Sequence, residues 1–188
     1  MTLHQRRSVP TGRFEIVRGE VVPLMPTGDV HSDVEGRVYR VLSDLEEAGL
    51  GLARVGEVGV VVVKDPLTAR GADAAFLLRE QLPHRTSKEG YLLTPPALVA
   101  EVVSPNDRAS EIQAKVLEYL KAGVKLVWVI DPGTRTVNVH LPDGNARTLQ
   151  SNDVLWAPGV FPDLSVSVAT LFKGLDRFKP VPPAQPDA

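Results

Sequence analysis

Residues 97–107 read Ala97-Leu98-Val99-Ala100-Glu101-Val102-Val103-Ser104-Pro105-Asn106-Asp107. The apolar run at 97–103 predicts a buried β-strand, and the polar residues after it are typical of a helix start, where side-chain oxygens cap free N–H groups. The helix predicted from there runs to about Ala122, because Gly123 is a natural stop, and a second buried strand follows at 124–130. This strand–helix–strand order predicts a parallel pair of strands joined by a crossover helix.

The segments on either side predict further strands around this unit. A hairpin is predicted around Arg18-Gly19, between strands at 14–17 and 20–22. A helix is predicted at about 29–48, with Asp29 as its cap, because apolar residues recur there at helical spacing. Further elements are expected as strands at 56–64, 73–78 and 136–141, a long loop at 79–96 and a turn of helix near 168–172. The sequence thus predicts an α/β fold with α+β character, a mixed β-sheet flanked by helices.

Composition indicates one globular domain. The chain has 188 residues, 43% of them hydrophobic, a formal net charge of −2 and no cysteine, which excludes disulfides and thiolate metal sites. Such a charge argues mildly against a protein that coats DNA, but a nuclease could rely on bound cations instead. We expect a flexible tail at 1–12, a single domain at 13–175 and a proline-rich disordered tail at 176–188.

The sequence also limits where the protein works and what it binds. No apolar segment follows Arg6-Arg7, so no signal peptide is predicted, and the longest apolar run, 58–63, is too short to cross a membrane. A cytoplasmic location is therefore expected. Glycine-rich nucleotide-binding motifs do not occur, so no nucleotide cofactor is expected.

Two carboxylates lie in apolar strands, where an isolated charge is costly. Asp73 begins one predicted strand and Glu101 lies in the middle of another. Asp73 could simply pair with Arg70 or Arg108, whereas Glu101 is harder to explain without a function.

Lys115 lies at the margin of the apolar face of the following helix. It could extend its amine to solvent or pair with Glu111, which shares its stripe with Tyr119. Only together do Asp73, Glu101 and Lys115 indicate a metal site.

An ordered set of short motifs extends this pattern over residues 14–172: Phe14-Glu15-Ile16-Val17-Arg18-Gly19-Glu20, Asp73-Ala74-Ala75-Phe76, Glu101-Val102-Val103-Ser104-Pro105, Lys115-x-x-x-Tyr119-x-x-x-Gly123-Val124 and Val127-Trp128-Val129-Ile130-Asp131-Pro132. In this set the chain resembles the Uma-two family of restriction-endonuclease-like proteins, a branch of the PD-(D/E)XK nuclease superfamily. Two positions depart from the pattern. Ala72 replaces a proline, and Val103 replaces a lysine that Lys115 would supply from the next helix.

The resemblance implies a restriction-endonuclease-like fold and a Mg²⁺-dependent or Mn²⁺-dependent DNA endonuclease. Asp73, Glu101 and the main-chain carbonyl of Val102 would hold the cation, and Lys115 would orient water or balance phosphate charge. Glu20 resembles the first acidic residue of the family, although a solvated turn carboxylate is an equal alternative.

Other candidates and alternatives remain open. His31 and Tyr119 are candidates for the rim of the site. The alternative function is a catalytically inactive nucleic-acid-binding or regulatory module that keeps the nuclease fold. A homodimer is suggested by the resemblance and by apolar residues near the C-terminus, which could equally close the domain's own core: Val154, Leu155, Trp156, Val160 and Phe161.

Overall fold

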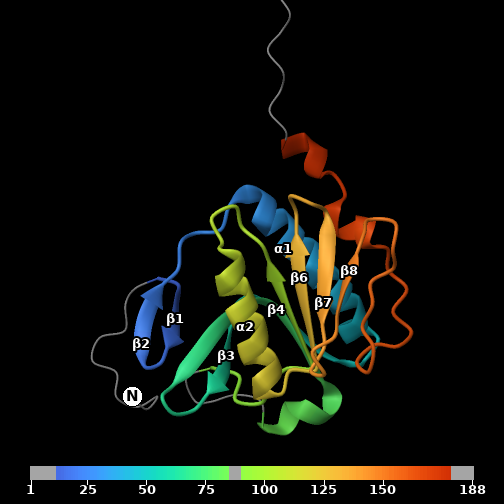
Figure 1. The fold of residues 1–188 in the computed structure, drawn as a ribbon. Coiled ribbons are helices and arrows are strands. Elements are labelled where there is room, and N and C mark those ends of the chain that lie inside the picture. Colours follow the sequence, from blue (N-terminus) through green and yellow to red (C-terminus); the bar gives the residue numbers. More distant parts are fainter. Residues whose placement is uncertain (1–11, 85–89, 179–188) are drawn as a thin grey trace, which may run out of the picture.

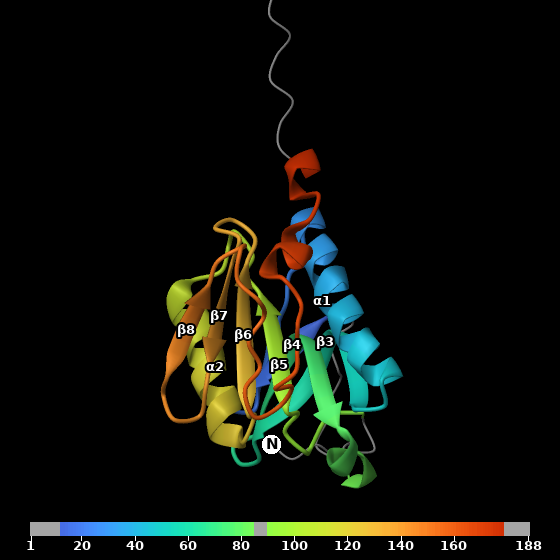
Figure 2. The same cartoon turned by 90° about the vertical axis from the view of Figure 1, so that its right-hand side faces the viewer.

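The fold is a mixed sheet of eight strands between two helices. The computed structural model describes residues 12–84 and 90–178. Helix α1 (Asp29–Glu47) covers one face of the sheet and helix α2 (Ala109–Ala122) covers the other (Figures 1 and 2). The predicted fold class, a mixed sheet flanked by helices, is confirmed. The N-terminal tail predicted at 1–12 lies outside the described residues, apart from Gly12.

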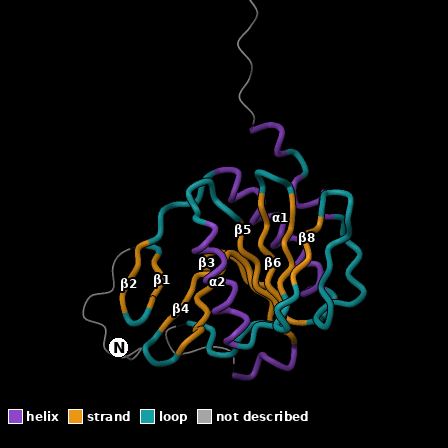
Figure 3. The backbone as a smooth tube through the Cα atoms, in the orientation of Figure 1, coloured by secondary structure: helices purple, strands orange, loops and turns teal. Residues whose placement is uncertain are grey.

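Seven strands lie side by side in the order β2-β1-β4-β5-β6-β7-β8, and β3 pairs with the other edge of β4 (Figure 3). Their bounds are β1 Phe14–Val17, β2 Glu20–Pro23, β3 Gly51–Val63, β4 Thr68–Leu78, β5 Leu98–Val102, β6 Leu126–Asp131, β7 Thr136–His140 and β8 Ala146–Leu149. Strands β5 and β6 are parallel and are joined by α2, as predicted, while the other paired strands are antiparallel.

The sheet separates two hydrophobic clusters, because successive residues of a strand point to opposite faces. Leu98, Ala100 and Val102 of β5 face α1, whereas Val99 faces α2. The larger cluster, on the α1 side, also takes in the C-terminal segment, which includes the short helix η2 (Val168–Phe172). This segment packs beside α1 and completes that layer (Figure 2).

Several element boundaries differ from the predictions. Helix α1 begins at Asp29, so its N-cap is Gly28 and the predicted Asp29 cap is wrong. Helix α2 begins only at Ala109, because Asp107 accepts a hydrogen bond from the Ser104 N–H within a separate turn. Strand β3 begins five residues earlier than predicted.

Two further segments differ in kind. The predicted loop at 79–96 begins with a short helix, η1 (Arg79–His84), and η3 (Leu175–Phe178) extends past the predicted domain end at 175, with Leu175 buried.

Candidate active site

The site lies at a split in the sheet. One edge of β4 pairs with β3 along most of its length, but the other edge is shared by two strands. It pairs with β1 at Ala69 and with β5 only from Ala74 onward. Residues 70–73 therefore have no strand beside them on this edge, and their buried main-chain groups need partners from side chains.

Gly71 shows how the chain meets this need. Its N–H donates to Glu15 Oε1 (3.0 Å), and its carbonyl accepts from Lys115 Nζ (3.2 Å). A Cβ at this position would collide with the carboxylate of Glu57, so a larger residue would require this flexible side chain to move. Charged side chains from β1, β3 and α2 thus meet at one residue of β4.

Glu101 is held by two donors from α2. Lys115 Nζ donates to Glu101 Oε2 (2.8 Å), and the Tyr119 hydroxyl donates to Oε1 (2.7 Å). Burial raises the pKa of Glu101 to about 7, although Lys115 acts in the opposite direction. Burial alone would lower the pKa of Lys115, but the charges of Glu101 and Glu15 outweigh it, so its pKa is raised and the amine stays protonated.

Asp73 lies where β4 changes its orientation. Ala72 packs in the cluster under α2 and Ala74 in the cluster under α1, although residues two apart on a regular strand share a face. The Asp73 carboxylate accepts a hydrogen bond from the Val102 N–H (2.6 Å) and lies 3.3 Å from His31 Nε2. It thus bonds the main chain of β5 at the point where β4 and β5 separate.

A β-bulge in β3 lies opposite this change. Val55 pairs with Ala74 and Val58 pairs with Ala72, so Gly56 and Glu57 together oppose Asp73. Both bulge residues have positive φ, +86° at Gly56 and +52° at Glu57. The non-glycine residue holds a sparsely populated backbone conformation beside the carboxylate cluster.

Carboxylates outnumber permanent cations here. Burial and the charge of Asp73 raise the pKa of Glu35 on α1 and that of Glu57. Burial alone would lower the pKa of His31, but its hydrogen bond to Asp73 and the surrounding carboxylates raise it. The cluster comprises five carboxylates (Glu15, Glu35, Glu57, Asp73 and Glu101) and three permanent cations (Arg13, Arg70 and Lys115).

The cluster has the donor set that a divalent cation requires. Hard oxygen ligands are in excess, and the buried His31 Nδ1 has no hydrogen-bond partner among the residues that the structure describes. A balanced network of structural ion pairs would not leave such an excess of carboxylate groups over permanent cations. The residues present therefore fit a bound metal ion.

Comparison with protein families assigns the chain to a known group. The family model Uma2, described as "Putative restriction endonuclease", matches residues 2–169. The chain belongs to the Uma2 family. Among solved structures it is similar to a putative nuclease of DUF820 from Anabaena variabilis ATCC 29413, with 21% identity and a TM-score of 0.71. The alignment covers 85% of this chain and 89% of that one. The comparison with curated proteins found no match.

Most of the residues expected from the Uma2 resemblance come together. Asp73, Glu101 and Lys115 meet at the split. Val102 also lies there, and its N–H donates a hydrogen bond to Asp73. His31 and Tyr119, expected at the rim, are instead buried and bond Asp73 and Glu101 directly. The alternative pairings do not form, because Lys115 bonds Glu101 rather than Glu111, and Arg70 bonds Glu15 and Glu118 rather than Asp73.

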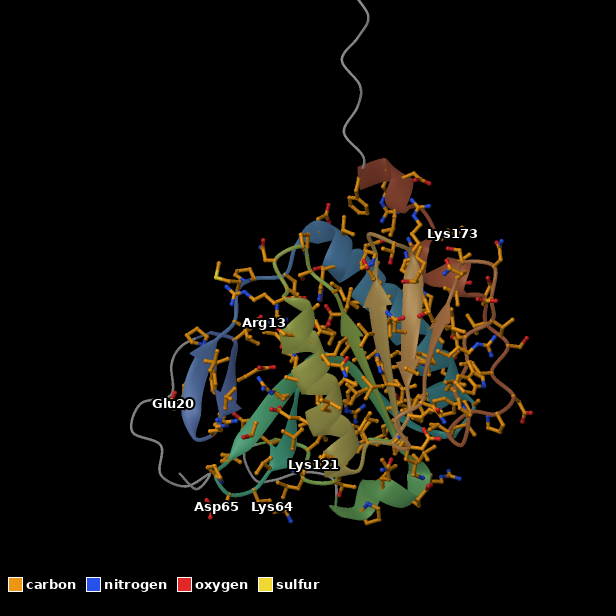
Figure 4. The ribbon with its side chains drawn as sticks, viewed as in Figure 1. Arg13, Glu20, Lys64, Asp65, Lys121 and Lys173 are labelled. Atoms are coloured by element: carbon orange, nitrogen blue, oxygen red, sulfur yellow. The ribbon has the colours of Figure 1, made fainter. Side chains whose placement is uncertain are left out.

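Glu20 is not part of this arrangement. It is exposed on the edge strand β2, at the outer side of the hairpin (Figure 4). Glu15 of the paired strand β1 enters the site in its place and accepts bonds from Gly71 and Arg70. Alternation along 14–17 did not indicate Glu15, because it places this residue on the face opposite Phe14 and Ile16, yet Glu15 is the buried residue of β1.

Sequence reasoning also missed Glu35 and Glu57. Gly56-Glu57 interrupts a valine-rich strand, and a glycine within a strand is typical of a bulge. Glu35 lies one helical turn after His31, so the two residues share a face of α1. Both signals are in the sequence, but neither says which side of the helix or strand faces Asp73.

The apolar C-terminal residues mostly serve the domain's own core. Leu155, Val160 and Phe161 are buried in the larger cluster and Trp156 packs against it, while Val154 is 51% exposed. A hollow lined by Arg147, Asp153 and Trp156 lies apart from the carboxylates at the split in the sheet. Within the described part of the chain, neither helix combines the length and apolar character needed to cross a membrane.

Proposed function

We propose that this chain is a divalent-metal-dependent endonuclease of the PD-(D/E)XK type that hydrolyses DNA phosphodiester bonds. The observation that carries the proposal is the meeting of Asp73, Glu101 and Lys115 at the split in the sheet, within an excess of carboxylates. Membership of a family described as "Putative restriction endonuclease" supports DNA as the substrate.

Asp73 and Glu101 would hold Mg²⁺ or Mn²⁺, with the Val102 carbonyl as the third protein ligand expected from the family pattern. When bound, such an ion lowers the pKa of water and stabilises charge that develops on a phosphate. Tyr119 and Lys115 fix the two oxygens of Glu101, so the carboxylate is oriented before any ligand arrives.

Lys115 has a further role in the proposal. Its ammonium group contacts Glu101, Glu15 and the Gly71 carbonyl, and 18% of its side chain is exposed. It therefore keeps a positive charge beside the carboxylates, where a phosphate would otherwise be repelled.

The test is a cleavage assay on plasmid and linear DNA with Mg²⁺ or Mn²⁺, with EDTA as the metal-free control. Glu101→Gln should abolish cleavage, because the amide keeps the shape but loses the charge that holds a cation. Glu111→Gln is the matched control, since Glu111 is exposed on the same helix, one turn before Lys115. Wild-type protein that binds DNA but never cleaves it with either metal would favour the inactive binding module.

A homodimer and a cytoplasmic location stay predictions. The main reason for expecting a dimer is now the family resemblance, because the apolar C-terminal residues other than Val154 close the core. Light scattering at high protein concentration would test the dimer.

A further inference from the structure

A second set of side chains that could bind a metal ion lies on the α1 side of Asp73. His31 and Glu35 project from one face of α1 toward β4, where Asp73 meets them. One potential ligand atom from each of the three residues lies within 4.8 Å of the other two. His31 is 6% exposed and Asp73 5%, so this set is enclosed by the fold.

The imidazole of His31 is incompletely bonded. Its Nε2 lies 3.3 Å from Asp73, but its Nδ1 is buried and has no hydrogen-bond partner in the described residues. Glu35 Oε2 is 3.8 Å from Nδ1, which is beyond hydrogen-bond distance. An unsatisfied buried polar atom is rare in folded proteins and requires an explanation.

A bound ion would provide that explanation. Donors about 2.1 Å from one metal, at tetrahedral or octahedral angles, lie roughly 3.0 to 3.4 Å apart. The 3.3 Å separation is measured from Nε2 and the 3.8 Å separation from Nδ1, and one imidazole gives only one of its nitrogens to an ion. One ligand atom from each of the three residues lies within 4.8 Å of the others, so binding requires side-chain rotations that bring them to this spacing. The same ion would offset the negative charge that Glu35, Asp73 and the neighbouring Glu57 bring together.

We propose that His31, Glu35 and Asp73 bind a transition-metal dication, with Asp73 shared between this site and the cation expected at Glu101. A nitrogen ligand selects against Mg²⁺, which prefers hard oxygen ligands and keeps several waters. Imidazole suits transition metals. The inference rests on the proposed function, because it specifies the metal class for one part of the same site.

The test uses Mn²⁺ as the probe on the full chain. Pulsed electron paramagnetic resonance of bound Mn²⁺ should show coupling to an imidazole nitrogen in wild type and in Glu101→Gln. His31→Gln should lose this coupling and weaken Mn²⁺ binding at least about tenfold. His140→Gln is the matched control, because His140 is a partly buried histidine of β7 outside the site.

A second variant keeps the test decisive if His31→Gln does not fold. The chain has four histidines, so the triple variant His4→Gln, His84→Gln, His140→Gln retains only His31. Nitrogen coupling that persists in the triple variant supports the inference.

The failures of the two proposals can be told apart. Absence of Mn²⁺ binding, Mn²⁺ bound without nitrogen coupling, or coupling that survives in folded His31→Gln overturns the inference. Cleavage with Mg²⁺ without nitrogen coupling overturns this inference alone, whereas coupling without cleavage overturns the proposed function alone.

Discussion

Replacing Lys115 by methionine tests whether the carboxylates at the split depend on a single buried ammonium group. Methionine keeps most of the apolar stem, but the charge 2.8 Å from Glu101 is lost. At an effective dielectric constant near 20, the attraction at that distance is about 6 kcal/mol. Desolvation of both groups offsets part of it, so we expect a loss of about 3–5 kcal/mol in the free energy of unfolding. For a chain of this size that corresponds to a fall of roughly 6–20 °C in Tm.

The assay is urea unfolding of four proteins at pH 8: wild type, Lys115→Met, Glu101→Gln and the double variant. The double variant should recover much of the loss, because the remaining buried charge at Glu101 has also been removed. The charge of Glu15 does not have to be removed as well, because Arg70 and the Gly71 N–H still bond Glu15 when Lys115 is replaced. Lys121→Met, at an exposed position in the last turn of α2, is the control. A coupling energy below about 1 kcal/mol would be that of a solvent-screened surface pair and would refute the reasoning.

Three further predictions concern the same cluster. In the folded protein the pKa of Glu101 is raised from 4.5 to about 7, so its contribution to stability is present below pH 4.5 and lost as the pH rises through 7. The free energy of unfolding, measured by urea denaturation at a series of pH values, should therefore fall by an amount of order 3 kcal/mol over that window. Glu101→Gln should remove this part of the pH dependence. Mn²⁺ at a hundred times its Kd should raise the Tm of wild type by roughly 5–11 °C in a thermal scan. Asp73→Asn should still fold but lose most of that rise. An equal rise in both proteins would count against Asp73 as a ligand. Glu57→Gly should stabilise the metal-free protein by roughly 0.5–2 kcal/mol in urea unfolding. The reason is that glycine removes the backbone strain of positive φ at this position, and this gain exceeds the loss of the ion pair with Arg13. A destabilised variant would show that the ion pair contributes more than the strain costs.

The sequence was sufficient to predict the elements that hold the site. Glu101 and Lys115 could be associated because the crossover helix must return over the strand that precedes it, and this places a face of α2 against β5. The register could not be predicted. The bulge at Gly56-Glu57 and the split between β1 and β5 arise from pairing between distant strands, and no local pattern records that pairing.

The choice between Glu15 and Glu20 shows the same limit. Both residues belong to one hairpin, and the hairpin was predicted correctly. Which carboxylate is buried depends on which face of β1 lies against β4, and that is set by the single pairing of Ile16 with Ala69. Similarly, the helix that carries His31 could be predicted, but the packing angle of α1 on the sheet could not. His31 was therefore predicted at the rim of the site, although it is buried.

The hydrogen bond from the Val102 N–H to Asp73 makes one amide a natural reporter. In a regular sheet this proton would face a neutral carbonyl, but here it faces a carboxylate 2.6 Å away. Its NMR chemical shift and hydrogen-exchange rate should therefore respond to whatever engages Asp73, whether a proton, a cation or the Asn substitution. One resonance of a main-chain amide could thus follow the occupancy of the site in solution, without a substrate and without any label at the carboxylates.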